Sequence, residues 1–136
     1  MKKFILIFSF ATALTLTAIS QISQDRAVFL DQTKAVKAKI EWNREIVAKS
    51  AGSIAIKITV KEGGKFSVLL LTDEDYQVAI GKRPEPINFR PKPIINVDAS
   101  NSFEKSIALE KGTYWLIIEN QEDVEKNISL TCSEIR

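Results

Sequence analysis

Apolar and polar residues alternate one by one over several short stretches of this chain, and this period of two constrains the fold most. In residues 53–61, the apolar positions Ile54, Ile56, Ile58 and Val60 share one parity, with polar or small residues between them. Alternation of this kind places successive side chains on opposite faces of a β-strand. An amphipathic helix would need apolar spacings of three and four, which this stretch lacks. The pattern therefore predicts half-buried strands.

The same patterns recur along the chain, with turn-forming residues between them. They predict strands at residues 26–30, 35–42, 53–61, 66–71, 76–80, 94–97, 103–109, 114–119 and 128–132. Residues 66–71 are apolar apart from Ser67, which is typical of a central strand covered on both faces. Gly63 and Gly64 predict a hairpin turn before this strand. Residues 44–50 are the one stretch that could instead form a helical turn. This count favours an all-β, antiparallel β-sandwich of jelly-roll type.

The first 20 residues have the features of a signal peptide. Lys2 and Lys3 precede a short apolar run, and Ala18 and Ser20 supply the small residues expected before a cleavage site. A membrane anchor is the alternative, but the run contains three threonines and falls short of about 20 predominantly apolar residues. We expect a signal peptide at 1–20, a single β-sandwich domain at 21–136, export to the periplasm or the outside of the cell, and no membrane span after cleavage.

Composition excludes several classes of function. The chain has 19 Lys and Arg against 17 Asp and Glu. Removal of Lys2 and Lys3 leaves 17 of each (19 minus 2 against 17), so the mature domain has no overall charge that would attract nucleic acid. Histidine is absent, which removes the usual general base and a common metal ligand. Cys132 is alone and alternates with Ile128 and Leu130, so we expect a small buried hydrophobe and no intramolecular disulfide. Neither an enzyme nor a cofactor is predicted.

Residues 102–120 carry a resemblance to known modules. They read SFEKSIALEKGTYWLIIEN, with a turn and strand at Gly112-Thr113-Tyr114 and an asparagine at Asn120. The stretch resembles the jelly-roll modules of the bacterial pre-peptidase C-terminal (PPC) type, and it is also GOLD-like. The resemblance implies a β-sandwich with a noncatalytic role.

The chain departs from the PPC pattern where those modules commonly carry an Asp-x-Asp-Leu-like strand. The comparable residues 66–71 are apolar, and acidic residues come only afterwards, at Asp73, Glu74 and Asp75. Carboxylates of this kind are possible calcium ligands, but these three lack the spacing of a dedicated calcium loop. A solvated turn and a metal site both stay open.

Two further features are candidates for binding. Residues 81–93 contain four prolines, which exclude a central strand or a helix there. This segment also carries Lys82, Arg83, Phe89, Arg90 and Lys92, a combination that could bind a protein partner, an anionic sugar or a lipid head group, or could serve only as a connector.

The aromatic residues Trp42, Tyr114 and Trp115 offer either core packing or a stacking surface for sugars. Tyr114 and Trp115 are adjacent in a predicted strand, so they cannot share a face. The sequence as a whole predicts an exported noncatalytic binding module that engages a protein partner, with a glycan-binding β-sandwich as the alternative.

Overall fold

The computed structural model describes residues 26–85 and 90–136, which form eight strands and one helix. The elements are β1 (Arg26–Val36), β2 (Glu41–Ala48), β3 (Gly52–Val60), β4 (Lys65–Thr72), α2 (Asp73–Ala79), β5 (Ile95–Ser100), β6 (Ser102–Leu109), β7 (Gly112–Asn120) and β8 (Lys126–Ile135). The predicted signal peptide at 1–20 and Phe89 lie outside the described residues.

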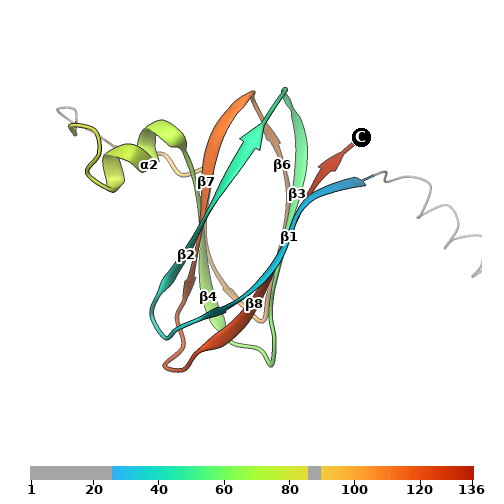
Figure 1. Ribbon diagram of the computed structural model, residues 1–136, viewed down its shortest axis with the longest axis vertical. Coiled ribbons are helices and arrows are strands. Elements are labelled where there is room, and N and C mark those ends of the chain that lie inside the picture. Colours follow the sequence, from blue (N-terminus) through green and yellow to red (C-terminus); the bar gives the residue numbers. More distant parts are fainter. Residues whose placement is uncertain (1–25, 86–89) are drawn as a thin grey trace, which may run out of the picture.

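The strands form two antiparallel four-stranded sheets that face one another (Figure 1). Sheet I has the order β1-β8-β3-β6, and sheet II has the order β5-β4-β7-β2. The sheets connect at one corner, where β5 and β6 pair only through Ser100 and Ser102. This strand order is that of a jelly roll. The predicted antiparallel β-sandwich is confirmed, and β5 is an edge strand as its short apolar run indicated.

The core lies between the two sheets and follows the alternation seen in the sequence. The inward side chains are fully or almost fully buried, and the largest of them are Phe66, Ile46, Ile56, Ile58, Leu70, Ile95, Leu116, Ile118, Ile128 and Leu130. Each such side chain contributes roughly 1.5–3 kcal/mol when it leaves water. Trp42, Tyr114 and Cys132 are buried with them, so all three pack in the core.

The turn at Gly63 and Gly64 is not the hairpin that the sequence predicted. Strand β3 pairs with β6 and β8, whereas β4 pairs with β5 and β7, so this turn carries the chain from sheet I to sheet II. Both glycines have positive φ, 79° and 145°. A Cβ on Gly63 would lie 2.6 Å from Oδ1 of Asn101, which accepts a hydrogen bond from the Gly64 amide at 3.0 Å. The glycines are needed here for a crossing between sheets.

Three local predictions are wrong as well. Residues 76–80 belong to the helix and the turn after it, not to a strand, and residues 44–48 belong to β2, not to a helical turn. Residues 35–42 do not form one strand because the chain turns after Val36, with Lys39 at a φ of 60° and a hydrogen bond from the Ile40 amide to the Lys37 carbonyl. Apolar residues happen to occupy every second position on both sides of this turn and within it, so the sequence pattern gave no sign that the strand ends there.

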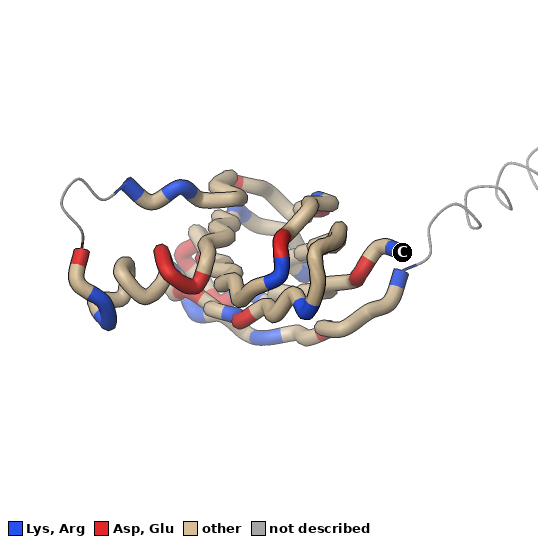
Figure 2. The backbone as a smooth tube through the Cα atoms, turned by 90° about the horizontal axis from the view of Figure 1, so that it is seen from above, with Lys and Arg blue, Asp and Glu red and all other residues tan. Residues whose placement is uncertain are grey.

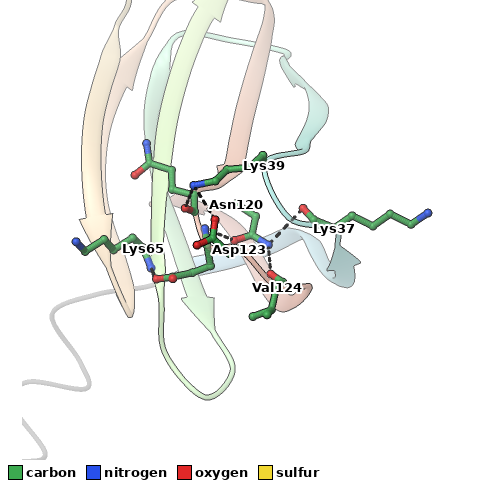
Figure 3. A network of polar contacts seen from close by, with 8 residues as sticks. Lys37, Lys39, Lys65, Asn120, Asp123 and Val124 are labelled. Carbon is green, nitrogen blue, oxygen red and sulfur yellow. Dashed lines mark hydrogen bonds and ion pairs between the residues drawn. The ribbon is translucent and has the colours of Figure 1, made fainter.

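Asn120 closes one end of the sandwich (Figure 3). Its side chain is 1% exposed, and its Nδ2 donates to the carbonyl oxygens of Val36 and Val124, both at 2.9 Å, and of Lys37 at 3.3 Å. Its Oδ1 accepts from the Glu122 amide at 2.9 Å. One amide therefore joins the turn between β1 and β2 to the loop between β7 and β8.

Within residues 26–85 and 90–136, no helix has the length and apolar character needed to cross a membrane.

Candidate functional site: helix α2 and the basic segment beside it

Helix α2 begins and ends with capping contacts that its own sequence supplies. Thr72 is the N-cap, and its hydroxyl oxygen accepts a hydrogen bond from the Asp75 amide at 3.2 Å. At the other end, the amides of Gly81 and Lys82 donate to the carbonyls of Val78 and Gln77. This pair of bonds, with Gly81 at a φ of 78°, is a Schellman motif, which a glycine favours. These caps allow a helix of only seven residues to interrupt a β-sandwich.

The helix docks on the outer face of sheet II through two aromatic rings. Tyr76 stacks on Trp115 of β7, with ring centroids 4.3 Å apart and planes 15° apart. The indole Nε1 donates to Oδ1 of Asp73 at 2.9 Å, and Nδ2 of Asn43 on β2 donates to the Tyr76 hydroxyl at 3.2 Å. Because α2 follows β4 directly and contacts β7 and β2, it is fixed across three strands.

Asp73 is the electrostatic centre of this contact. Hydrogen bonds from Gln77 Nε2, at 3.0 Å, and from the Trp115 indole hold the pKa of its carboxyl below the usual value, and the nearby charge of Arg83 adds to this effect. The ionised carboxylate at the first helical position also interacts favourably with the helix dipole. The acidic residues that the sequence singled out are therefore the first turn of α2.

The geometry of that turn gives little support to calcium binding, because carboxylate oxygens of the turn already accept hydrogen bonds. The Asp73 carboxylate is occupied by Gln77 and Trp115, and one oxygen of Asp75 accepts from the Lys92 amide at 3.4 Å. Among the described residues, no three or more Asp, Glu, Cys or His side chains gather in a metal-binding arrangement.

The basic segment starts where α2 ends. The side chains of Lys82, Arg83, Arg90 and Lys92 are all exposed. In Figure 1 the helix and the chain after it project to one side of the sandwich, and Figure 2 shows Lys and Arg on both arms of this projection. We call Lys82, Arg83, Arg90 and Lys92 the basic projection. Four of the six binding residues expected from the sequence are thus exposed, two on each arm, while the fifth, Phe89, lies outside the described residues.

Trp115, the sixth binding residue expected from the sequence, is not a free ring that could stack on a sugar from both sides. It lies on the outer face of β7, opposite to the buried Tyr114, as the alternation predicted. Tyr76 covers one face of the indole, and the indole nitrogen is already hydrogen bonded to Asp73. Trp115 therefore anchors the helix that carries the basic projection. The sequence did not reveal this role because Tyr76 was assigned to a strand.

Cys132 offers no reactive thiol. Burial raises its pKa to about 12, although the charge of Arg44 acts in the opposite direction. A thiol with so high a pKa carries almost no thiolate at neutral pH, and the thiolate is the nucleophile.

Comparison with solved structures identifies the fold. The pre-peptidase C-terminal domain of a collagenase from Bacillus anthracis aligns with a TM-score of 0.58 at 14% identity, over 76% of this chain and 87% of that domain. This chain has the β-sandwich fold of PPC-type modules. The resemblance drawn from residues 102–120 is confirmed at the level of the fold, and the likeness to GOLD domains stays a prediction.

Two other β-rich proteins align less closely with the PPC-like fold of this chain. A mitogen from Yersinia pseudotuberculosis gives a TM-score of 0.52 at 13% identity, over 83% of this chain and 87% of the mitogen. A family 35 carbohydrate-binding module from Clostridium thermocellum gives 0.39 at 12% identity, over 80% and 91% of the two chains. A scan against models of protein families found no match, and a search of curated proteins found none either.

Proposed function

We propose that this PPC-like protein is an exported, noncatalytic module that binds an acidic protein partner through the basic projection. The observation that carries the proposal is the placement of four exposed cations on a helix-anchored excursion from an otherwise regular sandwich. Complementary charge would steer an acidic partner toward this projection and fix its orientation. The lack of histidine in the whole chain supports a noncatalytic role, and the signal-peptide features of residues 1–20 support export.

Three of the four cations of the basic projection are not held in a salt bridge within the described residues. Among the described residues, Lys82, Arg83 and Lys92 form no ion pair within 4.0 Å, since the recorded pairs join Arg26 to Glu104, Lys39 to Asp123 and Arg136 to Glu134. Exposed cations that are not held in a salt bridge lose little when they meet carboxylates of a partner. The stacked rings of Tyr76 and Trp115 restrict the motion of the helix, which lowers the entropic cost of binding.

A pull-down from the envelope and secreted fractions of the native organism tests this function. The bait is the chain from Gln21 onward, compared with a variant in which Lys82, Arg83, Arg90 and Lys92 are all changed to Ala. The matched control changes four exposed lysines of the sandwich, Lys49, Lys57, Lys105 and Lys111, to Ala. Both variants lose four positive charges, so only the position of the charges differs.

We expect one protein to be retained by the native chain and by the control, and to be lost with the basic-projection variant. Retention should weaken as salt rises, because exposed charges are screened. Equal loss of the retained protein with both variants would contradict the proposal, because it would show that binding depends on the total charge of the domain and not on the basic projection. Retention of polysaccharide alone would favour the glycan-binding alternative, which a shift of tryptophan fluorescence on titration with that polysaccharide would then support.

A further inference from the structure

The sandwich is open along the side where β1 and β2 lie. These edge strands belong to different sheets, and among the described strands β1 pairs only with β8 and β2 only with β7. In Figure 1 they diverge from the turn that joins them toward the opposite end of the sandwich. A cavity of about 200 Å³ lies at that end, and its apolar wall includes Phe29, Ile46, Ala48 and Ile54.

Arg44 enters the sandwich from this open side. It lies on β2 between Trp42 and Ile46, which share its parity and are both buried in the core. Its register partner on β7 is Leu116, another buried core residue, so Arg44 belongs to the inner face. The effect of its charge on the thiol of Cys132, an inward residue of β8, agrees with this placement.

One donor of the Arg44 guanidinium, the Nε group, lacks an acceptor. This Nε is buried without a hydrogen-bond partner, and no ion pair within 4.0 Å joins Arg44 to any other residue in the described part of the chain. A buried donor without an acceptor is unfavourable, and Arg44 itself is partly exposed, so the carboxylate of a ligand would meet an accessible part of the guanidinium. Arg and carboxylate form paired hydrogen bonds of matched geometry.

Arg44 is not among the residues that line the cavity, but its position on β2 adjoins them. Ile46 is the next inward residue after Arg44 on β2, and Glu134 is the next inward residue after Cys132 on β8; both line the cavity. Inward neighbours on one strand are roughly 7 Å apart, within the reach of an arginine side chain. Glu134 is engaged by Arg136 at 3.9 Å, which offsets its negative charge at the mouth.

We propose that this open side binds a small carboxylic acid with an apolar group of five to seven carbons. The carboxylate would pair with Arg44, and the apolar group would fill the cavity beside Ile46 and Ile54. The size follows from the volume. A closed apolar cavity of about 150 Å³ accommodates benzene, and this one, which is partly open and is also lined by Ser50, Ser53 and Glu134, has about 200 Å³. The site lies between the inner faces of the two sheets, with residues of β1, β3 and β8 on one side and of β2 on the other, whereas α2 docks on the outer face of sheet II.

Titration of the purified protein with phenylacetate and hexanoate, followed by calorimetry and by amide chemical shifts, tests the proposal. The neutral controls are 2-phenylethanol and hexanol, which have the same apolar groups without the charge. We expect both acids to bind with saturation, to shift the amides of Ile46 and Cys132, and to bind at least tenfold more tightly than the alcohols, as expected for roughly one charged hydrogen bond.

Two variants separate the two parts of the site. Arg44→Met keeps an unbranched side chain but removes the charge, so acid affinity should fall at least tenfold while the alcohols are unaffected. Gly52→Leu should block all four ligands, because Gly52 lines the cavity and a Cβ there would meet no atom within 4 Å. Lys57→Met is the matched control, since it removes an exposed cation of β3 that does not line the cavity.

Circular dichroism and thermal unfolding establish that each variant is folded. The proposal is overturned if neither acid saturates the native protein below about 10 mM, which is affinity of only a few kcal/mol. Unchanged acid affinity in a folded Arg44→Met protein also overturns it, and so does unchanged affinity in a folded Gly52→Leu protein.

Discussion

Asn120 shows how much one buried side chain can organise. Its amide satisfies three carbonyls and one backbone amide that come from two separate connections, and Lys39 reinforces the same junction through the Gln121 carbonyl and, at 3.6 Å, the Asp123 carboxylate (Figure 3). The sequence marked Asn120 only through a resemblance. Its partners could not be predicted, because most of them are backbone groups whose positions depend on two turns far apart in the chain.

Asn120→Ala should lower the free energy of unfolding by about 2–4 kcal/mol, because it leaves buried carbonyls and an amide without partners. Urea unfolding followed by circular dichroism measures this change. Asn127→Ala, at an exposed asparagine of β8, is the matched control and should change stability by less than about 0.5 kcal/mol. Similar stabilities for the two variants would contradict a structural role for the Asn120 amide.

At the scale of elements, strands were predictable and the helix was not. Period-two alternation is local, so most strands could be placed from the sequence. Residues 76–80 misled the prediction because Tyr76, Val78 and Ile80 alternate and favour strands. The helix signals were present, with Thr72 as a cap, acids in the first turn and Gly81 after the end. Arg44 was missed for a related reason, since its own stretch was assigned to a helical turn.

The docking of α2 should depend on the ionisation of Asp73. Its pKa is lowered in the folded protein, so the stabilisation is complete above the pKa of the unfolded chain, about 4, and is lost as pH falls through the folded value. Tryptophan fluorescence should report the release of Trp115 from Tyr76 in that acid range. Asp73→Asn should weaken docking at pH 7 and remove this acid transition.

Glu74→Gln is the control for that titration, because Glu74 is an exposed acid of the same turn. An acid transition that persists unchanged in Asp73→Asn, or disappears in Glu74→Gln, would show that another group is responsible.

At the scale of the whole molecule, the sequence did not allow us to predict which strands pair with one another. The first strand pairs with the last, and β2 pairs with β7, so the contacts that define the sheets join distant parts of the chain. Alternation tells which residues point inward but not which strand lies beside which. This is why Gly63 and Gly64 were recognised as a turn yet assigned to the wrong kind of connection. A fold with such non-local pairing is expected to form slowly, in milliseconds to seconds.

Cys132 should report unfolding of the whole domain. It is fully buried on β8 between β1 and β3, with a pKa raised to about 12 by burial. A thiol reagent at pH 8 should therefore leave the native protein unmodified for as long as Cys132 stays buried between the packed sheets. The labelled fraction in increasing urea should follow the loss of β-sheet circular dichroism. Rapid labelling without denaturant would show that this side of the sandwich opens locally.

The pairing of β1 with β8 has a mechanical consequence. Strand β1 begins where β8 ends, with Arg26 beside Ile135, and the two run antiparallel. The ladder bonds lie across the strands, so tension applied to Arg26 and Ile135 would load one pair of residues at a time. Strands β1 and β8 should therefore separate one residue pair at a time from this corner, under a small force. In an assembly that pulls on Arg26 and Ile135, the domain would unfold before it carried a large load.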